Sequence, residues 1–220
     1  MILEEMSDFF SARAEMYDSH MLREVEGCRE GYAAMAGLVP EKSRRLLDLG
    51  CGTGLELAPI FEKIPTLSVT GIDLTQTMLD KLKEKYEGKN IRLICGSYFD
   101  VELEEAYYDC AVSFQTMHHF SHEKKRFLYR KVLRSLRPGG CYIEADYMVE
   151  RQEEEDYYFS ENQRLREEQG IPMEAFYHYD TPCTVENQKK LLMQSGFERV
   201  KQDFRIENTT ILTAWKGKQE

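Results

Sequence analysis

A turn rich in glycine follows a short apolar run near residue 50 of this 220-residue chain. Residues 46–54 read Leu-Leu-Asp-Leu-Gly-Cys-Gly-Thr-Gly. Each glycine lets the backbone adopt a positive φ and approach a ligand with no Cβ in the way, and a helix after the turn offers free N–H groups. A second apolar run, 67–73, ends in Asp73. A carboxylate about 20 residues after such a turn is placed to accept hydrogen bonds from ribose hydroxyls, so the sequence predicts a nucleoside site.

The spacing of the glycines separates two classes of nucleoside cofactor. A dinucleotide site needs G-x-G-x-x-G, which requires a glycine at position 55, where this chain has Leu55. A nicotinamide-dependent oxidoreductase is therefore a disfavoured alternative. Gly50, Gly52 and Gly54 instead run G-x-G-x-G behind Asp48. This pattern resembles the first motif of the class I S-adenosylmethionine-dependent methyltransferases.

The resemblance extends over roughly residues 40–145, where three further motifs follow in the family's order. Asp73 and the residues after it, 74–79, are similar to the ribose-binding strand end and its helix. Ser97 stands where the family usually has an Asp beside the adenine. Residues 108–115 resemble the fourth strand, and residues 136–140 the turn before the fifth.

The resemblance implies that S-adenosylmethionine is the cofactor and that the chain is an enzyme. No metal ion is expected, because the sequence shows no obvious cluster of carboxylates. The resemblance assigns the cofactor site to Asp48, Gly50, Cys51, Gly52, Asp73, Leu74, Met78, Ser97, Tyr98 and Gln115. A purely structural interpretation stays open at this point. A glycine turn also occurs in α/β proteins that bind nothing there, and Asp73 could simply cap the following helix.

Strands and helices alternate from about residue 44, which predicts an α/β, doubly wound, mostly parallel, seven-stranded Rossmann-like sheet with helices on both faces. We expect strands at 45–49, 67–73, 91–95, 109–114, 141–146, 198–204 and 209–215. Pro59 predicts a helix that begins only shortly before it. Thr75 and Thr184 are expected to cap the helices that follow them.

One domain accounts for residues 1–220, since single domains commonly reach ~250 residues. We divide it into an N-terminal helical cap of one or two helices (1–39), a cofactor-binding core (40–146), a helical lid (147–182), and a C-terminal helix and strand pair (183–216). The lid carries aromatic clusters at 157–159 and 176–180. Such density suits an amphiphilic small-molecule pocket, although the rings could instead pack the lid onto the sheet.

Methyl transfer by in-line displacement needs positioning more than a nucleophile, but a hydroxyl or protonated amine acceptor needs a base. The catalytic residue is unknown. The main candidates are His178, His119 and Tyr17, and His118 and Asp180 are further candidates. Residues 113–116 lack the Asn/Asp-Pro-Pro-Tyr/Phe motif of enzymes that methylate amides or nucleobases. We therefore expect a metal-independent enzyme with a small-molecule acceptor, and O-, N-, S- and C-methylation stay open.

The net charge and the composition limit which partners and which compartment are expected. A net charge of −10 repels a phosphate backbone, so no nucleic acid is expected. The basic residues of 124–134 and the acidic run 153–156 are expected on solvated helix faces. The six cysteines form no C-x-x-C pair, and we expect reduced thiols in the cytoplasm, with no membrane span or leader. The sequence does not give the oligomeric state. A cofactor-binding protein without catalysis, and an enzyme that methylates protein or tRNA, are the alternatives.

Overall fold

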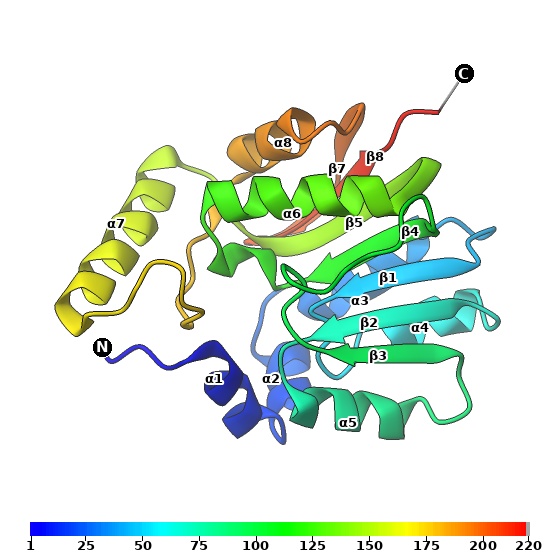
Figure 1. The fold of residues 1–220 in the computed structure, drawn as a ribbon, viewed down its shortest axis with the longest axis horizontal. Coiled ribbons are helices and arrows are strands. Elements are labelled where there is room, and N and C mark those ends of the chain that lie inside the picture. The colour runs from blue at the N-terminus through cyan, green and yellow to red at the C-terminus, as the bar shows by residue number, and fades with distance from the viewer. Residues whose placement is uncertain (219–220) are drawn as a thin grey trace.

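The strands join in the order β3-β2-β1-β4-β5-β8-β7 in a computed structural model that describes residues 1–218 (Figure 1). Neighbours from β3 through β5 are parallel, and β8 is antiparallel to both β5 and β7. The strands are β1 (Arg45–Leu49), β2 (Ser68–Asp73), β3 (Ile91–Cys95), β4 (Tyr108–Phe114), β5 (Leu136–Val149), β6 (Cys183–Thr184), β7 (Arg199–Ile206) and β8 (Thr209–Trp215). The doubly wound, mostly parallel sheet is confirmed. The two-residue β6 pairs with β5 in addition to the seven predicted strands.

Two layers of helices bury the two faces of the sheet. The helices are α1 (Met6–Arg13), α2 (Tyr17–Arg23), α3 (Cys28–Leu38), α4 (Leu57–Lys63), α5 (Gln76–Lys85), α6 (His122–Ser135), α7 (Gln152–Gln169) and α8 (Val185–Gln194), with a 3₁₀ turn at Met117–His119. Apolar residues of α3, α4 and α5 pack on one face, and those of α6 and α8 on the other. Burial on both faces explains why β1 and β4 read as nearly continuous apolar runs.

Strand β5 is longer than predicted at both ends. Leu136 already pairs with Tyr108, ahead of a register shift between Tyr108 and Cys110. The segment before residue 141, which we expected to be a turn, therefore belongs to the strand. At the other end β5 continues past residue 146, because Met148 and Val149 pair with β6.

The predicted helix starts are confirmed, with one change in how a cap is made. Thr184 caps α8, since its hydroxyl accepts a hydrogen bond from the Asn187 N–H at 3.2 Å. Pro59 lies in the first turn of α4, where a missing N–H breaks no hydrogen bond. Thr75 precedes α5 but makes no side-chain cap. Its own N–H donates to the carboxylate of Asp73 at 2.9 Å, which therefore orders the start of the helix.

Two charged side chains expected in solvent are buried instead. Lys125 on α6 is 1% exposed, and its ammonium donates to Cys183 Sγ at 3.1 Å and to Gln188 Oε1 at 3.2 Å. Glu155 on α7 is also 1% exposed and accepts from the Thr184 N–H at 2.5 Å. The predictions that Lys125 and Glu155 face solvent were therefore wrong. Other segments of the chain pack against the helix surface that carries each of these charges.

The N-terminal segment and the lid form one cover over the carboxyl ends of the parallel strands (Figure 1). The first 38 residues contain three helices rather than the expected one or two. The Met6 N–H donates to the Phe176 carbonyl, and the His178 N–H to the Glu4 carbonyl, each at 2.9 Å. The two segments are thereby joined as a short antiparallel bridge. Within residues 1–218, no helix has the length and apolar character needed to cross a membrane.

Candidate functional site

A narrow cavity of about 50 Å³ opens at the carboxyl ends of β1, β2 and β3. Five of the predicted cofactor residues line it: Gly50, Asp73, Leu74, Ser97 and Tyr98. The sequence did not assign the rest of the wall, which includes Thr75, Gly96, Thr116 and Phe120, to the cofactor site. Aromatic rings from the N-terminal segment and the lid, Phe10 and Phe176, close the cavity from outside. The strand ends and the cover therefore build this cavity together.

Two glycines of the turn have different physical requirements. Gly50 has a φ of 69°, and a Cβ there would lie 2.6 Å from the Thr116 hydroxyl, so the fold itself demands glycine. Gly52 has a φ of 47°, but a Cβ there would meet nothing closer than the Tyr17 ring at 3.8 Å. The fold leaves this space open. Gly52 therefore provides a cradle in which a ligand can touch the backbone, and the arrangement fits the amino-acid end of S-adenosylmethionine.

Asp73 is held in place before any ligand binds. One carboxylate oxygen accepts from the Gly52 N–H at 2.9 Å, and the other accepts from the Thr75 N–H at 2.9 Å and the Thr75 hydroxyl at 2.6 Å. Burial raises the pKa of Asp73, while these hydrogen bonds act to lower it. Cap and ligand roles are compatible, because a carboxylate has about four acceptor positions and three are used.

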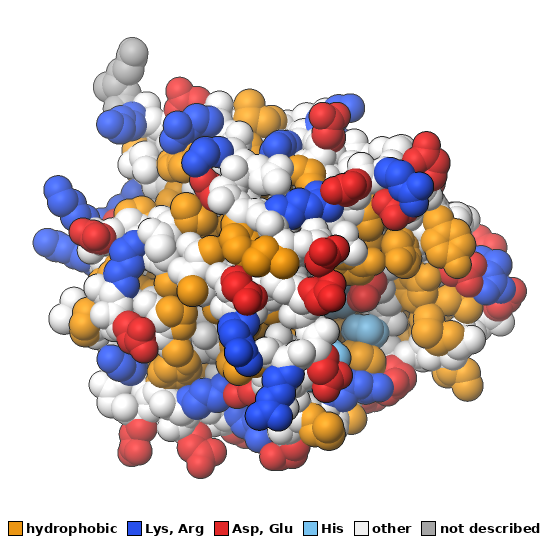
Figure 2. Space-filling model, turned by 180° about the vertical axis from the view of Figure 1, so that it is seen from behind, with side chains coloured by type: hydrophobic (Ala, Val, Ile, Leu, Met, Phe, Trp, Pro, Cys, Tyr) orange, Lys and Arg blue, Asp and Glu red, His pale blue; other side chains and the backbone are white. Residues whose placement is uncertain are grey.

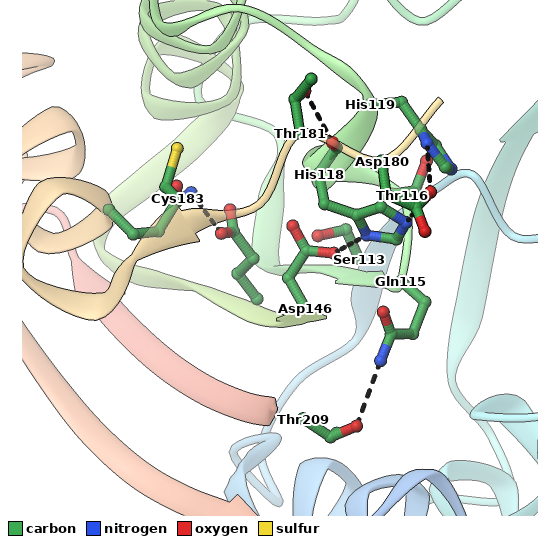
Figure 3. Close-up of polar contacts among 12 residues, drawn as sticks. Ser113, Gln115, Thr116, His118, His119, Asp146, Asp180, Thr181, Cys183 and Thr209 are labelled. Carbon is green, nitrogen blue, oxygen red and sulfur yellow. Dashed lines mark hydrogen bonds and ion pairs between the residues drawn. The ribbon is translucent and has the colours of Figure 1, made fainter. Parts of the chain in front are cut away.

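The remaining predicted cofactor residues lie outside this cavity. Asp48, Cys51 and Met78 are buried and line neither this cavity nor the larger one described below. Burial, and then the neighbouring Glu56, raise the pKa of Asp48 well above its usual range. Gln115 faces a second, larger cavity, where its amide donates to the Thr209 hydroxyl at 3.2 Å (Figure 3). These side chains are not brought together with Asp73 in one wall.

The larger cavity has a volume of about 910 Å³ and lies between the N-terminal helices, the lid and the ends of β4 and β5. Histidine is visible in a hollow flanked by acidic and apolar side chains in Figure 2. Phe10 and His119 line both cavities, so they form the wall between them. All three predicted catalytic candidates, Tyr17, His119 and His178, line the larger cavity.

A cluster of imidazoles surrounds one carboxylate oxygen in this cavity (Figure 3). Asp180 Oδ1 lies 3.5 Å from His118 Nε2, 3.4 Å from His119 Nδ1 and 3.8 Å from His178 Nε2. On its other side His118 Nδ1 lies 2.6 Å from Asp146 Oδ1. Asp146 is 1% exposed and was missed by the sequence reasoning, because position 146 reads only as the end of an apolar strand.

The surroundings give these groups different protonation behaviour. Burial acts to lower the pKa of His118, but the carboxylates of Asp146 and Asp180 raise it to about 10. Burial lowers the pKa of His119 well below its usual range and also lowers that of His178. Burial raises the pKa of Tyr17, so its hydroxyl keeps its proton. Neutral His119 and His178 can accept a proton, whereas Tyr17 keeps its own proton and can act only as a hydrogen-bonding group.

Comparison with known proteins agrees with the fold. The model of a methyltransferase domain family matches residues 46–140. Carboxy-S-adenosyl-L-methionine synthase of Helicobacter pylori (strain G27) is 30% identical over 182 residues, 78% of this chain and 75% of the relative. The synthase of the same name from Campylobacter lari is 24% identical over 97% of this chain and 96% of the relative.

A solved structure adds likeness of fold. Human N-acetylserotonin methyltransferase in complex with S-adenosylmethionine aligns with a TM-score of 0.65 at 17% identity, over 95% of this chain and 55% of that one. This chain thus spans about half the length of that structure. Together with the curated relatives, these findings place the chain in the class I S-adenosylmethionine-dependent methyltransferase family. It is an enzyme, and its cofactor is S-adenosylmethionine.

Proposed function

We propose that this enzyme transfers a methyl group to a small-molecule acceptor bound in the larger cavity. The observation that carries the proposal is the shared wall: Phe10 and His119 line both the narrow cavity at Asp73 and the larger one. A cofactor whose ribose lies at Asp73 and whose amino-acid end lies at Gly52 would present its methyl group at this wall. The larger cavity, about 910 Å³, has room for an acceptor of metabolite size.

The charged residues that line the larger cavity limit the class of acceptor. Four carboxylates line the larger cavity: Glu24, Glu26, Asp180 and Glu207. Among its lining residues, all within the described chain, Arg13 is the single Lys or Arg, and its guanidinium already pairs with Glu4 at 3.0 Å. The rim therefore favours a neutral or cationic acceptor over an anion. Phe9, Phe10, Tyr17 and Tyr147 supply the apolar surface for an amphiphilic one.

The chain's own residues then have to position the acceptor and move one proton. S-adenosylmethionine supplies an electrophilic methyl group on a sulfonium that already leaves readily. An acceptor hydroxyl or ammonium must lose a proton, and we assign its removal to His178, whose neutral ring stacks on Phe9 with centroids 3.5 Å apart. A positioned base of this kind typically contributes a factor of about 100 to 10,000 in rate.

In this proposal each segment of the chain has a separate role. Residues 40–146 hold the cofactor through Gly50, Asp73, Leu74, Ser97 and Tyr98 at the narrow cavity and through Gly52 at the turn. Asp48, Cys51 and Met78 would support these residues from the buried core, and Gln115 would reach the cofactor from the larger cavity. Residues 1–39 and 147–182 enclose the acceptor. Residues 183–216 complete the sheet below it.

The test is transfer of an isotopically labelled methyl group from S-adenosylmethionine to metabolites in a cell extract. We expect a labelled small molecule with the wild-type chain and none with Asp73→Ala. Asp80→Ala is the matched control, because Asp80 lies on α5 and bonds only to Gln76 on the same helix. Label found only in protein or tRNA, or cofactor binding without any labelled product, would contradict the proposal.

The names of the relatives favour a second candidate, synthesis of carboxy-S-adenosyl-L-methionine. The two candidates differ in the nucleoside that the protein carries. Mass spectrometry of the ligand released from freshly purified protein distinguishes them, because a carboxylated sulfonium is heavier than S-adenosylmethionine by one CO₂. Recovery of the carboxylated form would favour the synthase.

A further inference from the structure

We propose that His118, His119 and Asp180 form a binding site for one divalent first-row transition-metal ion, with Zn²⁺ the ion to test first. Each of these residues offers one ligand atom, and the three atoms lie within 4.8 Å of one another. Two imidazoles and one carboxylate are a common ligand set for zinc and for iron(II) in proteins. The sequence predicted no metal, because it shows no cluster of carboxylates and no cysteine with a histidine at zinc-ligand spacing.

The separations fit an ion placed between the ligands. Zinc bonds of about 2.0–2.1 Å in a tetrahedron place ligand atoms about 3.4 Å from one another. Asp180 Oδ1 lies 3.5 Å from His118 Nε2 and 3.4 Å from His119 Nδ1. These distances exceed the 2.7–3.2 Å range of good N–H···O hydrogen bonds. Small side-chain rotations would therefore complete the first coordination shell.

The imidazoles around Asp180 Oδ1, at 3.4 Å or more, lie too far away for good hydrogen bonds. This Oδ1 atom is buried and accepts no hydrogen bond from any residue in the described part of the chain. Such an atom is costly to bury unless a positive charge or a donor satisfies it. An ion at the proposed site would bind this oxygen directly.

A buried carboxylate orients His118 for this role. Asp146 Oδ1 lies 2.6 Å from His118 Nδ1, so Nδ1 carries the donated proton and Nε2 points toward Asp180 (Figure 3). A carboxylate on the far nitrogen is the usual support of a metal-binding histidine. The backbone is fixed as well, because the Thr181 N–H and hydroxyl both donate to the His118 carbonyl, at 2.6 and 2.9 Å.

One side of the site stays open to the larger cavity. The Asp180 side chain is 40% exposed, and His178 Nε2 lies 3.8 Å from its Oδ1, beside the open position. Catalytic zinc sites keep such an open position for water or substrate. If the proposed function is right, on which this part rests, the ion would hold the heteroatom of the acceptor.

A second group of potential ligands, His122, Glu155 and Cys183, does not carry the same inference. The Lys125 ammonium lies 3.1 Å from Cys183 Sγ, and His122 Nε2 lies 2.8 Å from Glu155. Side chains of this chain therefore already supply the positive charge there. At Asp180 the cavity lining offers no free Lys or Arg, because Arg13 is paired with Glu4, and the charge of His118 is shared with the buried Asp146.

The experiment is calorimetric titration of the chelator-treated, full-length protein with Zn²⁺, together with the visible absorption of a Co²⁺ complex. We expect one ion per chain. His119→Gln and Asp180→Asn should each weaken binding at least tenfold, and Asp146→Asn by 10- to 100-fold, the usual effect of losing such a support. His20→Gln is the matched control, because His20 lines the same cavity but pairs only with Glu24.

Each outcome separates the metal site from the proposed function. Absence of Zn²⁺ binding by a wild-type sample that still binds S-adenosylmethionine would overturn the metal site and leave methyl transfer standing. Binding that survives in both His119→Gln and Asp180→Asn would also overturn it, because the ion would then lie elsewhere. Binding that these variants abolish, in an enzyme that labels no small molecule, would support the site and refute the proposed function.

Discussion

The Glu155 carboxylate of the lid helix α7 lies 2.8 Å from His122 Nε2, in the first turn of α6. Glu155 also accepts from the Thr184 N–H at 2.5 Å and from the Asn187 amide at 3.0 Å. One buried carboxylate thus joins the lid to α6, to β6 and to the start of α8. This anchor holds the lid beside the larger cavity, because residues 176–180, which carry His178 and Asp180, follow α7 after the short segment 170–175.

Removing this anchor should loosen the lid. In Glu155→Gln the volume is kept but the charge is lost, and a hydrogen bond to a charged group is worth about 1.5–3 kcal/mol. We expect the free energy of unfolding, measured by urea denaturation, to fall by about 1–3 kcal/mol. The exposed neighbour Glu153 provides the control. Equal stability of Glu155→Gln and Glu153→Gln would refute the anchor.

The same pair should make stability depend on pH. Contacts with Cys183 and Glu155 raise the pKa of His122 to about 9, so its contribution is complete below its unfolded pKa of about 6.5 and is lost as pH rises through 9. Burial acts to raise the pKa of Glu155, but its hydrogen bonds, first that from His122, lower it to about 2. Its contribution is complete above about 4.5 and is lost as pH falls through 2.

The pair should therefore stabilise the fold most between about pH 4.5 and 6.5. Urea denaturation of wild type and His122→Gln at pH 6 and pH 10 measures this. The stability difference between the two proteins should be larger at pH 6. A difference that stays constant, or grows toward pH 10, would show that His122 is not the titrating partner.

Much of the fold follows from the sequence, because periodic apolar patterns report burial directly. Buried runs predicted the seven long strands within a few residues, and Thr184 marked a helix start. The pattern failed at Lys125 and Glu155. Periodicity predicts that a charged residue on a polar helix face is exposed to solvent. Whether it is buried depends on partners that are distant in the sequence, such as Cys183 and Gln188 for Lys125.

The candidate site divides in the same way. Asp73, Gly50 and Ser97 could be predicted because the turn and strand ends lie within one local unit whose geometry is set by short-range chemistry. Asp146 and the grouping of His118, His119 and Asp180 could not. They meet only after the lid folds back across β4 and β5, a contact that no local spacing encodes.

Lys125 provides a direct test of buried charge. Its ammonium bonds to Cys183 and Gln188 and lies near the buried Glu144, whose pKa burial raises to about 7. Removing one partner of a buried ionic group typically costs about 3–5 kcal/mol. We expect Lys125→Ala to lose stability of that order in urea denaturation, while Arg126→Ala, on the exposed side of the same helix, changes it by less than about 0.5 kcal/mol.

Gly52→Ala separates backbone strain from loss of the cofactor cradle. The φ of 47° makes any side chain there strained, at about 1–2 kcal/mol. The new Cβ would stand in the open space above the turn, so we expect affinity for S-adenosylmethionine, measured by calorimetry, to fall at least tenfold.

Gly88→Ala is the matched control for that strain. Gly88 has a φ of 80°, a Cβ added there would meet no atom within 4 Å, and the residue lines neither cavity. This variant should lose similar stability and keep full cofactor affinity. Unchanged affinity in Gly52→Ala would mean that the cofactor does not touch this turn.

A substitution at Ser97 is predicted to increase the affinity for S-adenosylmethionine. It lines the narrow cavity and its hydroxyl accepts from the Phe99 N–H at 3.2 Å, at the position where the family usually has Asp. A charge-assisted hydrogen bond is roughly twice as strong as a neutral one. We therefore expect Ser97→Asp to tighten S-adenosylmethionine binding by about threefold to tenfold, and Ser97→Ala to weaken it.

In Ser97→Asp the new carboxylate should bind the adenine amino group. An analogue of the cofactor that lacks this amino group tests the contact by itself. The S-inosyl counterpart of the cofactor has a carbonyl oxygen in place of the amino group, which repels a carboxylate instead of donating to it. Calorimetry with both ligands should show a gain in Ser97→Asp for the adenosyl compound alone. An equal gain for both would place residue 97 away from the adenine edge, and the tightening would then come from general electrostatic attraction to the sulfonium.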